Sequence, residues 1–258
     1  MVRELLQPRT RPETSQPGRP FGRQATRRLR ALYDRLVATY GPQSWWPAKT
    51  AFEVIVGAYL TQNTAWKSVE RSIANLEAHG ILSIDGLRSI PEDQLRALIR
   101  PSGFMLRKAT ALKAFVAFLD AHYSGQIDAL RDAAARSSGA VRKELLALPG
   151  VGPETADAIL LYALGAPAMV VDTYLRRVVT RHELAPEKAN YAAIQSLAEA
   201  AFAPDCLRED PRELARHYNE FHALFVQIGK DYCGPVARCE SCPLRYDLPH
   251  SRSRPGSP

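Results

Sequence analysis

The feature that most constrains this chain is a glycine-rich turn, Leu-Pro-Gly-Val-Gly, at residues 148–152. An amphipathic helical pattern precedes it at 141–148, and a second helix is predicted from Pro153, where the missing N–H of proline costs nothing. Two glycines around one valine let another molecule approach the backbone without meeting a Cβ. A helix that starts at such a turn offers unpaired N–H groups and the positive end of its dipole, which suits a phosphate.

Helical spacing of apolar residues continues through the rest of the chain, with Gly, Pro, Ser or Asn between the segments. No stretch reads convincingly as a strand, so the sequence predicts an all-α fold of about ten helices of ordinary length. No apolar run approaches the ~20 residues that a membrane span needs. The predicted helices are 24–40, 51–60, 65–78, 91–99, 108–122, 127–136, 141–148, 153–162, 173–182, 186–202 and 211–230.

Positive charge is concentrated at the N-terminus. The formal net charge is +7, and residues 1–30 hold eight arginines against only Glu4 and Glu13. The remaining chain is nearly neutral, so it must bind a polyanion through local features. Residues 1–22 are expected to form a disordered basic arm, with a transit peptide as the weaker alternative, and residues 249–258 a disordered tail.

The turn and the residues after it resemble a known family. Residues 141–162 are similar to the helix-hairpin-helix element of the endonuclease III superfamily of DNA glycosylases, and Asp172 falls where that family keeps its catalytic aspartate. The resemblance implies a two-lobed all-α fold, with a six-helix barrel lobe at 49–165 and a second lobe, with a Cys-rich loop, at 23–48 and 166–248. Without it, a glycine cap between packed helices and an N-cap role for Asp172 would explain the pattern.

The resemblance also implies the chemistry. Lyase-competent members carry a lysine two residues after the second glycine, and its amine forms a Schiff base with the sugar. Here that residue is Glu154, so a monofunctional N-glycosylase of base excision repair is expected, without strand cleavage. Asp172 would stabilise the charge that develops on the sugar and orient the water, and its place before a helix should keep it ionised.

Further residues match the family's DNA contacts. Gln62, within Thr-Gln-Asn-Thr at 61–64, is expected to fill the gap that an extruded base leaves, although a helix C-cap is the alternative. The expected partner is double-stranded DNA with damaged bases, bound by a monomer in the cytoplasm at the nucleoid, and relatives also hold a monovalent cation at the hairpin carbonyls. The other expected DNA-binding residues are Gly150, Val151, Gly152, Thr155 and Lys230.

The base pocket is expected near two tryptophans. Trp45, Trp46, Pro47 and Phe52 resemble the corresponding stretch of the 3-methyladenine DNA glycosylase III branch, which also has Glu at the hairpin position. A cationic N-alkylated purine stacks well on such rings, so alkylated purines such as 3-methyladenine are the expected substrates. The alternative is that the tryptophans only pack the first helix onto the core. Leu224 replaces the lysine of that branch, which leaves the preferred base open.

Three cysteines, Cys233, Cys239 and Cys242, crowd into ten residues and predict a metal site in a reducing compartment. Their spacing resembles the first three ligands of the [4Fe–4S] loop of endonuclease III, but the fourth position is Leu248. Asp247 or His250 could supply a fourth ligand, a Cys3His zinc site is an alternative, and so is a loop without metal. A cluster is the favoured reading.

Two other functions stay open at this point. One is an endonuclease III-like glycosylase and AP lyase for oxidised or mismatched bases, with Lys230 or Lys108 as a substitute nucleophile. The other is a non-catalytic helix-hairpin-helix DNA-binding protein. Retention of Asp172 speaks against the second, because gripping phosphates does not need it.

Overall fold

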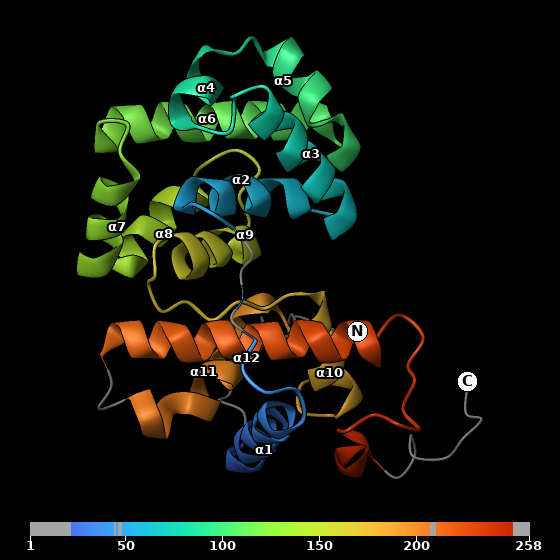
Figure 1. Ribbon diagram of the computed structural model, residues 1–258. Helices are drawn as coiled ribbons and strands as arrows, with labels where there is room; N and C mark the ends of the chain where they lie inside the picture. The colour runs from blue at the N-terminus through green and yellow to red at the C-terminus, as the bar shows by residue number, and fades with distance from the viewer. Residues whose placement is uncertain (1–21, 44, 46–47, 207–209, 250–258) are drawn as a thin grey trace, which may run out of the picture.

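The computed structural model describes residues 22–43, 45, 48–206 and 210–249, and these form helices joined by short turns (Figure 1). Within these ranges no β-strand forms, and only an isolated bridge joins Cys233 and Ala237. The all-α prediction is therefore confirmed. The α-helices are α1 Arg23–Tyr40, α2 Ala51–Thr61, α3 Trp66–Ala78, α4 Ile84–Ser89, α5 Glu92–Leu98, α6 Met105–Tyr123, α7 Ile127–Arg136, α8 Ser138–Leu146, α9 Pro153–Ala158, α10 Thr173–Arg181, α11 Tyr191–Cys206 and α12 Pro211–Asp231.

Three short elements complete the structure: the 3₁₀ turns η1 Arg100–Ser102 and η3 Arg245–Asp247, and the π-helix η2 Ile159–Ala163. Several expectations lie outside the described residues: Trp46, Pro47, the basic arm apart from Gly22, and the tail apart from Pro249. None of the described helices has the length and hydropathy needed to cross a membrane.

Two hydrophobic cores organise the helices into the two layers of Figure 1. The first core draws its buried residues from 52–168, and the second from 29–36 together with 158–244. The helix after the glycine-rich turn contributes to both, since Ile159 and Leu160 pack in the first core while Ala158 and Leu161 pack in the second. The turn at 148–152, called the hairpin below, is thereby held at the junction of the layers.

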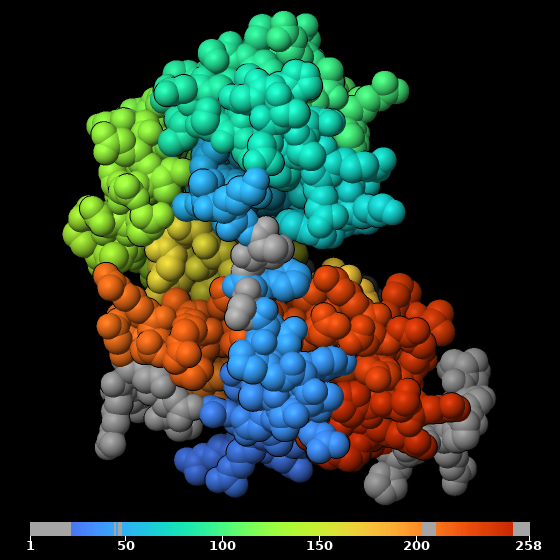
Figure 2. All heavy atoms as spheres, in the orientation of Figure 1, coloured from blue at the N-terminus to red at the C-terminus, as the bar shows by residue number. Residues whose placement is uncertain are grey.

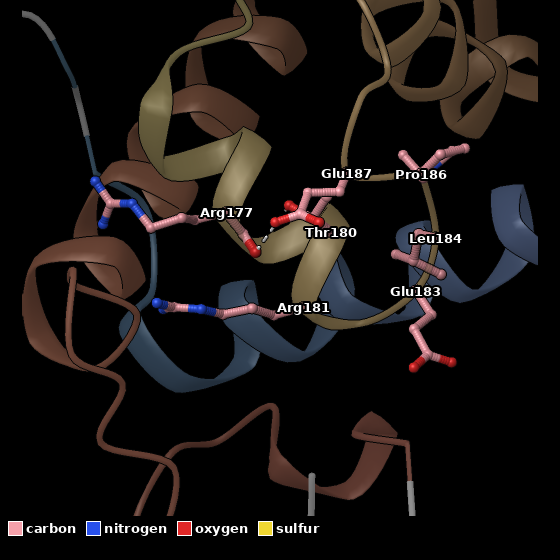
Figure 3. Close-up of a pocket in the computed structure, with 8 residues that line it drawn as sticks. Arg177, Thr180, Arg181, Glu183, Leu184, Pro186 and Glu187 are labelled. Carbon is pink, nitrogen blue, oxygen red and sulfur yellow. Dashed lines mark hydrogen bonds between the residues drawn. The ribbon is translucent and has the colours of Figure 1, made fainter. Parts of the chain in front are cut away.

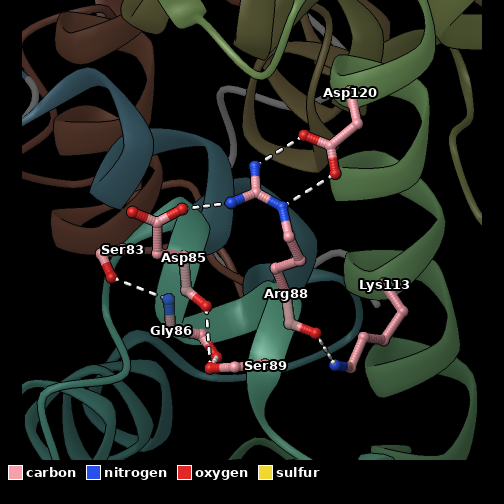
Figure 4. Close-up of polar contacts among 7 residues, drawn as sticks. All are labelled: Ser83, Asp85, Gly86, Arg88, Ser89, Lys113 and Asp120. Carbon is pink, nitrogen blue, oxygen red and sulfur yellow. Dashed lines mark hydrogen bonds and ion pairs between the residues drawn. The ribbon is translucent and has the colours of Figure 1, made fainter.

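Two helices differ most from the sequence prediction, while α6 and α8 begin three residues earlier than predicted. Helix α4 is not predicted, because six residues are too short to display a helical period. It forms because the Ser83 hydroxyl accepts from Gly86 N at 3.0 Å, and Arg88 then pairs with Asp120 of α6 (Figure 4). Helix α11 begins at Tyr191 rather than at 186, because Asn190 caps it by accepting from Ala193 N at 2.8 Å.

Candidate active site

A cavity of about 710 Å³ opens where the two layers meet. Its walls come from the loop after α2, the hairpin, the start of α10 and the inner face of α12. Figure 2 shows the surface hollowed between the α3 side of one layer and the α12 side of the other. The structure brings together in this cavity the predicted site residues Trp45, Gln62, Gly150, Gly152, Glu154, Thr155, Asp172 and Lys230.

Asp172 is the N-cap of α10 and is only 9% exposed. Its Oδ1 accepts a hydrogen bond from Leu175 N at 2.8 Å, so one carboxylate oxygen is fixed by the backbone. Its Oδ2 lies 3.5 Å from Nε2 of His222. The residue is therefore both a helix cap and a cavity residue, and the positive end of the α10 dipole favours its negative charge.

Glu154 lies in the first turn of α9 and lines the same cavity. Its side chain is accessible from the cavity, but the cavity walls exclude part of the bulk water that would otherwise surround it. This desolvation, together with the nearby negative charge of Asp172, raises the pKa of Glu154. Two carboxylates with different environments thus share one site, an arrangement typical of acid–base or electrostatic catalysis.

Gln62 is the C-cap of α2, and its side chain also reaches the hairpin. Its Nε2 donates to the Gly150 carbonyl at 2.8 Å and to the Thr155 hydroxyl at 2.9 Å. The Thr155 side chain is buried behind this contact. To enter a DNA duplex, Gln62 must release the hairpin, and the Gly150 carbonyl then becomes available to another donor or to a cation.

The hairpin backbone explains why its two glycines differ. Gly150 has φ +75°, a left-handed conformation that other residues rarely adopt, and a Cβ there would lie 3.4 Å from Ala111 Cβ. Val151 closes the turn through a bond from its N–H to the Leu148 carbonyl at 3.2 Å and buries its side chain in the first core. A Cβ at Gly152 would meet nothing within 4 Å. The fold therefore does not require a glycine at position 152.

The aromatic part of the predicted pocket is only partly as expected. The ring of Trp45 lies under Lys230, whose Nζ is 5.0 Å from the ring centroid, and both line the cavity. Phe52 does not lie in the cavity: it is 6% exposed and packs in the first core. The reason is that α2 is buried on nearly every side, so its first turn faces the core.

Sequence reasoning gave no site role to several residues that the structure brings near the cavity. Tyr191 and His222 line it, and Tyr162 contacts His222 through its hydroxyl. They lie far apart in the sequence on three different elements, so no local pattern marks them. Phe104 is exposed at 61% at the start of α6 and was likewise missed, although its φ of +47° is unusual for a bulky residue.

Lys108 has a different role from the nucleophile considered above. It is 3% exposed, and its Nζ donates to Leu60 O and Thr64 Oγ1 at 2.7 Å and to Ser102 O at 2.8 Å. Burial lowers the pKa of Lys108 to about 8. These bonds fasten the loop that carries Gln62 to the start of α6, and they leave no hydrogen of the ammonium group for other partners.

A second cavity, of about 620 Å³, lies on the other side of α10 (Figure 3). Arg177 and Arg181 extend from α10 in the same direction there. Arg177 donates to Cys233 O at 2.7 Å, and Arg181 donates to Gly234 O at 2.8 Å and to Cys233 Sγ at 3.1 Å. The two arginines thus hold the cysteine loop against α10.

The three cysteines line one small cavity of about 20 Å³ with Leu248. Asp247, considered above as a ligand, instead receives two bonds from Arg28 at 2.9 Å and one from His182 at 3.0 Å. Among the described side chains, no three Cys, His, Asp or Glu residues are arranged to hold a metal. The residues do not fit a four-cysteine cluster.

This donor set leads to a prediction about metal content. We expect protein purified anaerobically to be folded without the broad visible absorption of a [4Fe–4S] cluster, because Leu248 cannot ligate iron and Asp247 is already paired. Iron and zinc analysis alongside the visible spectrum provides the measurement. Stoichiometric iron and sulfide with visible absorption would contradict this expectation and restore the sequence prediction, whereas stoichiometric zinc would support the Cys3His alternative.

Comparisons with known proteins agree with this geometry. Residues 56–204 match the model of the HhH-GPD superfamily of base excision DNA repair proteins. A Methanocaldococcus jannaschii protein, whose name describes a DNA repair glycosylase, is 41% identical over 214 residues, covering 83% of this chain and 92% of the relative. The Bos taurus endonuclease III-like protein 1 is 29% identical over 213 residues, covering 80% of this chain and 61% of that protein.

Solved structures show the same architecture. The 3-methyladenine DNA glycosylase of H. pylori, bound to 1,N6-ethenoadenine, superposes with a TM-score of 0.67 and 29% identity, covering 80% of this chain and 97% of that one. A non-covalent endonuclease III–DNA complex gives 0.70 at 22% identity, with coverage of 88% and 95%, and supports the fold alone. The chain therefore belongs to the HhH-GPD superfamily of base excision DNA repair proteins, within the endonuclease III superfamily, and it is a DNA glycosylase.

Proposed function

We propose that the protein is a monofunctional DNA glycosylase that releases N-alkylated purines from duplex DNA. The observation that carries this proposal is the pairing of Asp172 with Glu154, rather than with a lysine, in a cavity beside the hairpin. Asp172 lines this cavity, with Oδ1 fixed by Leu175 N and Oδ2 3.5 Å from His222 Nε2. A fixed carboxylate stabilises the positive charge that develops on the sugar as the base departs.

The substrate class is proposed from the two carboxylates and the aromatic ring of the cavity, whose walls also hold the cations Arg177 and Lys230. Asp172 and Glu154 place negative charge near the base and sugar, and Trp45 supplies an aromatic face. A purine that carries a positive charge gains from both features, and its charge also makes it a good leaving group. The H. pylori relative was solved bound to 1,N6-ethenoadenine, a neutral alkylated adenine, which supports a pocket for modified purines. Lys230 would move off Trp45 when a base stacks there.

The DNA-binding roles complete the proposal. Gln62 is proposed to leave the hairpin and fill the gap that the flipped base vacates. Phe104 lies close to the loop that carries Gln62. Lys108 donates to Thr64 in that loop, and its Nζ is 5.9 Å from the centroid of the Phe104 ring. An exposed aromatic ring at that place suits a wedge between neighbouring base pairs.

Release of base without strand cleavage distinguishes the proposal from its alternatives. Duplexes that each carry one lesion (3-methyladenine, 1,N6-ethenoadenine, an oxidised pyrimidine or a mismatched thymine) are incubated with the protein. We expect release of the alkylated purines, with strand breaks only after alkali. Release of the oxidised or mismatched bases alone would contradict the substrate class, and binding without any release would indicate a non-catalytic protein.

Covalent trapping tests the absence of lyase chemistry. We expect borohydride to trap no protein–DNA adduct, because Glu154 cannot form an imine and the amine of Lys108 is held by three oxygen acceptors. The measurement is a denaturing gel of protein incubated with lesion or abasic DNA and borohydride. A lyase-competent endonuclease III serves as the positive control, and a strong adduct with this chain would contradict the proposal.

A bifunctional enzyme is the second candidate, because Lys230 lines the same cavity as Asp172. If an adduct forms, Lys230→Gln should remove it, while Lys108→Gln tests the buried lysine separately. Loss of the adduct in Lys230→Gln alone would assign the nucleophile to α12 and replace the monofunctional proposal.

The hairpin glycines give a matched pair of variants. Gly152→Val should leave the Tm nearly unchanged, because a Cβ there meets nothing within 4 Å, but it should weaken binding to every duplex alike. Gly150→Val should lower the Tm as well, because φ is +75°. Thermal melts and binding to matched and lesion duplexes are the measurements. A loss of affinity confined to lesion DNA would contradict the phosphate role and assign the hairpin to the base pocket.

A further inference from the structure

The side of Asp172 that faces away from the α10 backbone is covered by one histidine. His222, on α12, is buried, and its Nε2 lies 3.5 Å from Asp172 Oδ2. That nitrogen is buried and makes no hydrogen bond in the described structure. The opposite ring nitrogen, Nδ1, is in short hydrogen-bond contact with the Tyr162 hydroxyl. The three groups therefore form a chain from Tyr162 through the imidazole to Asp172.

The two contacts of the ring select its tautomer. A carboxylate oxygen next to Nε2 favours a hydrogen on that nitrogen, and Nδ1 of the neutral ring must then accept. Tyr162 supplies the donor, and burial raises the pKa of Tyr162 well above its usual value, which keeps the hydroxyl protonated. With Nδ1–H instead, an imidazole lone pair would face the carboxylate oxygen, which is repulsive.

The position of Tyr162 depends on an uncommon backbone feature. It lies in the π-helix η2, where Leu164 N donates to the Ile159 carbonyl at 3.1 Å, five residues earlier. Tyr162 packs against both hydrophobic cores and lies 5.8 Å from the imidazole, centroid to centroid. The wider turn therefore comes where the segment after the hairpin packs against α12, and single π-turns are frequent at functional sites.

We infer that Tyr162 and His222 are positioning residues for Asp172: the tyrosine hydroxyl fixes the Nε2–H tautomer of His222, and that N–H holds Asp172 Oδ2 in the orientation that stabilises the transition state. The inference rests on the proposed role of Asp172. The 3.5 Å separation of the free protein shortens to a hydrogen bond when substrate is bound, as catalytic contacts in unliganded enzymes commonly do. The other titratable groups on the walls of the cavity are Glu154, Tyr174, Arg177, Tyr191 and Lys230, and the charge of Arg176 also acts on Glu154.

Two substitutions of the same histidine separate positioning from packing. His222→Gln keeps an N–H near the place of Nε2 and retains most of the base-release rate. His222→Asn places its amide near Nδ1, leaves Asp172 Oδ2 without a donor, and lowers the single-turnover rate by about 10- to 100-fold. Without that donor the carboxylate takes a proton more readily, so the acidic limb of the pH–rate profile moves toward neutral pH in Asn but not in Gln.

Tyr162→Phe tests the tautomer with almost no change of shape. We expect a rate loss and the same displacement of the acidic limb. Tyr123→Phe is the matched control, because it removes a hydroxyl that bonds Glu144 at 2.5 Å far from the cavity, and it should change neither. Thermal melts of all four variants identify any that fail to fold.

Long-range ¹H–¹⁵N spectra of the imidazoles read the tautomer directly, and loss of one set of signals in His222→Gln assigns His222 among the six histidines. At pH 8 we expect Nε2–H in the wild type and a loss of that preference in Tyr162→Phe. A wild-type Nδ1–H tautomer would overturn the inference. Wild-type rates and pH profiles in both His222→Asn and Tyr162→Phe would also overturn the inference. If Asp172→Asn is inactive in the same experiment, the proposed function is unaffected. Activity in Asp172→Asn would instead remove the proposed function itself.

Discussion

Asp172→Asn is expected to abolish base release while leaving the fold and DNA affinity almost unchanged. Asparagine is as good an N-cap as aspartate, so the bond from Leu175 N to the side-chain oxygen is kept and α10 stays intact. What is lost is the negative charge that stabilises the positive charge on the sugar as the base departs. We expect the single-turnover rate to fall by about 10²- to 10³-fold or more, because the lost stabilisation belongs to the transition state.

The measurement is the single-turnover release of 3-methyladenine, with binding to the same duplex followed in parallel. Glu154→Gln is an informative companion, because it changes the other carboxylate of the cavity and is expected to lower the rate less. Wild-type turnover in Asp172→Asn would refute the assignment of the chemistry to this residue. A large loss of DNA affinity in the same variant would indicate a binding role instead.

Asp157→Ala is expected to cause the largest loss of stability among the variants considered. Asp157 is fully buried and accepts from Arg142 Nε at 2.6 Å and Nη2 at 2.9 Å, from Tyr191 at 2.8 Å, and from Gln195 at 2.9 Å. Removing it leaves an arginine, a hydroxyl and an amide without their acceptor. We expect a loss of about 3 kcal/mol in the free energy of unfolding, because four hydrogen bonds to a fully buried carboxylate are lost.

The loss should extend to the active site. Tyr191 also accepts a hydrogen bond from Val171 N at 3.2 Å, directly before Asp172, so the network positions the segment that carries the proposed catalytic carboxylate. Thermal melts should show a Tm lower by about 6–12 °C. Asp120→Ala is the matched control, because Asp120 also pairs with one arginine, Arg88, but at the exposed surface (Figure 4). An equal loss of Tm in both variants would contradict the special role of the buried network.

Much of the fold was predictable because its signals are local. The spacing of apolar residues predicts that α1 begins at Gln24, and in the structure it begins at Arg23. Pro211 is the first residue of α12 in the prediction and in the structure. Helix α4 was missed because its stability comes from the Ser83 cap and from the contact of Arg88 with α6, neither of which has a period in the sequence. The early start assigned to α11 arose because Pro186 is a good first helical residue, whereas Asn190 is the cap that forms.

The candidate site divides in the same way. The hairpin glycines, Asp172 and Glu154 belong to one continuous segment, so the resemblance to the endonuclease III superfamily could be recognised there. His222 and Tyr162 come together only through the packing of α12 against η2, which no local pattern encodes. Phe52 was assigned to the pocket by resemblance to the 3-methyladenine DNA glycosylase III branch, but the helix turns its side chain into the first core.

The central claim is that the protein releases an alkylated base and leaves the strand uncut. The most direct measurement uses one end-labelled duplex that carries a single 3-methyladenine, incubated with wild-type protein and divided into samples with and without alkali, beside the same duplex without protein. We predict free 3-methyladenine in both protein samples beyond its spontaneous loss, and a cut strand only in the alkali-treated one. Strand cleavage without alkali would contradict the monofunctional mechanism, and intact duplex with the base still attached, despite tight binding, would contradict glycosylase activity on alkylated purines.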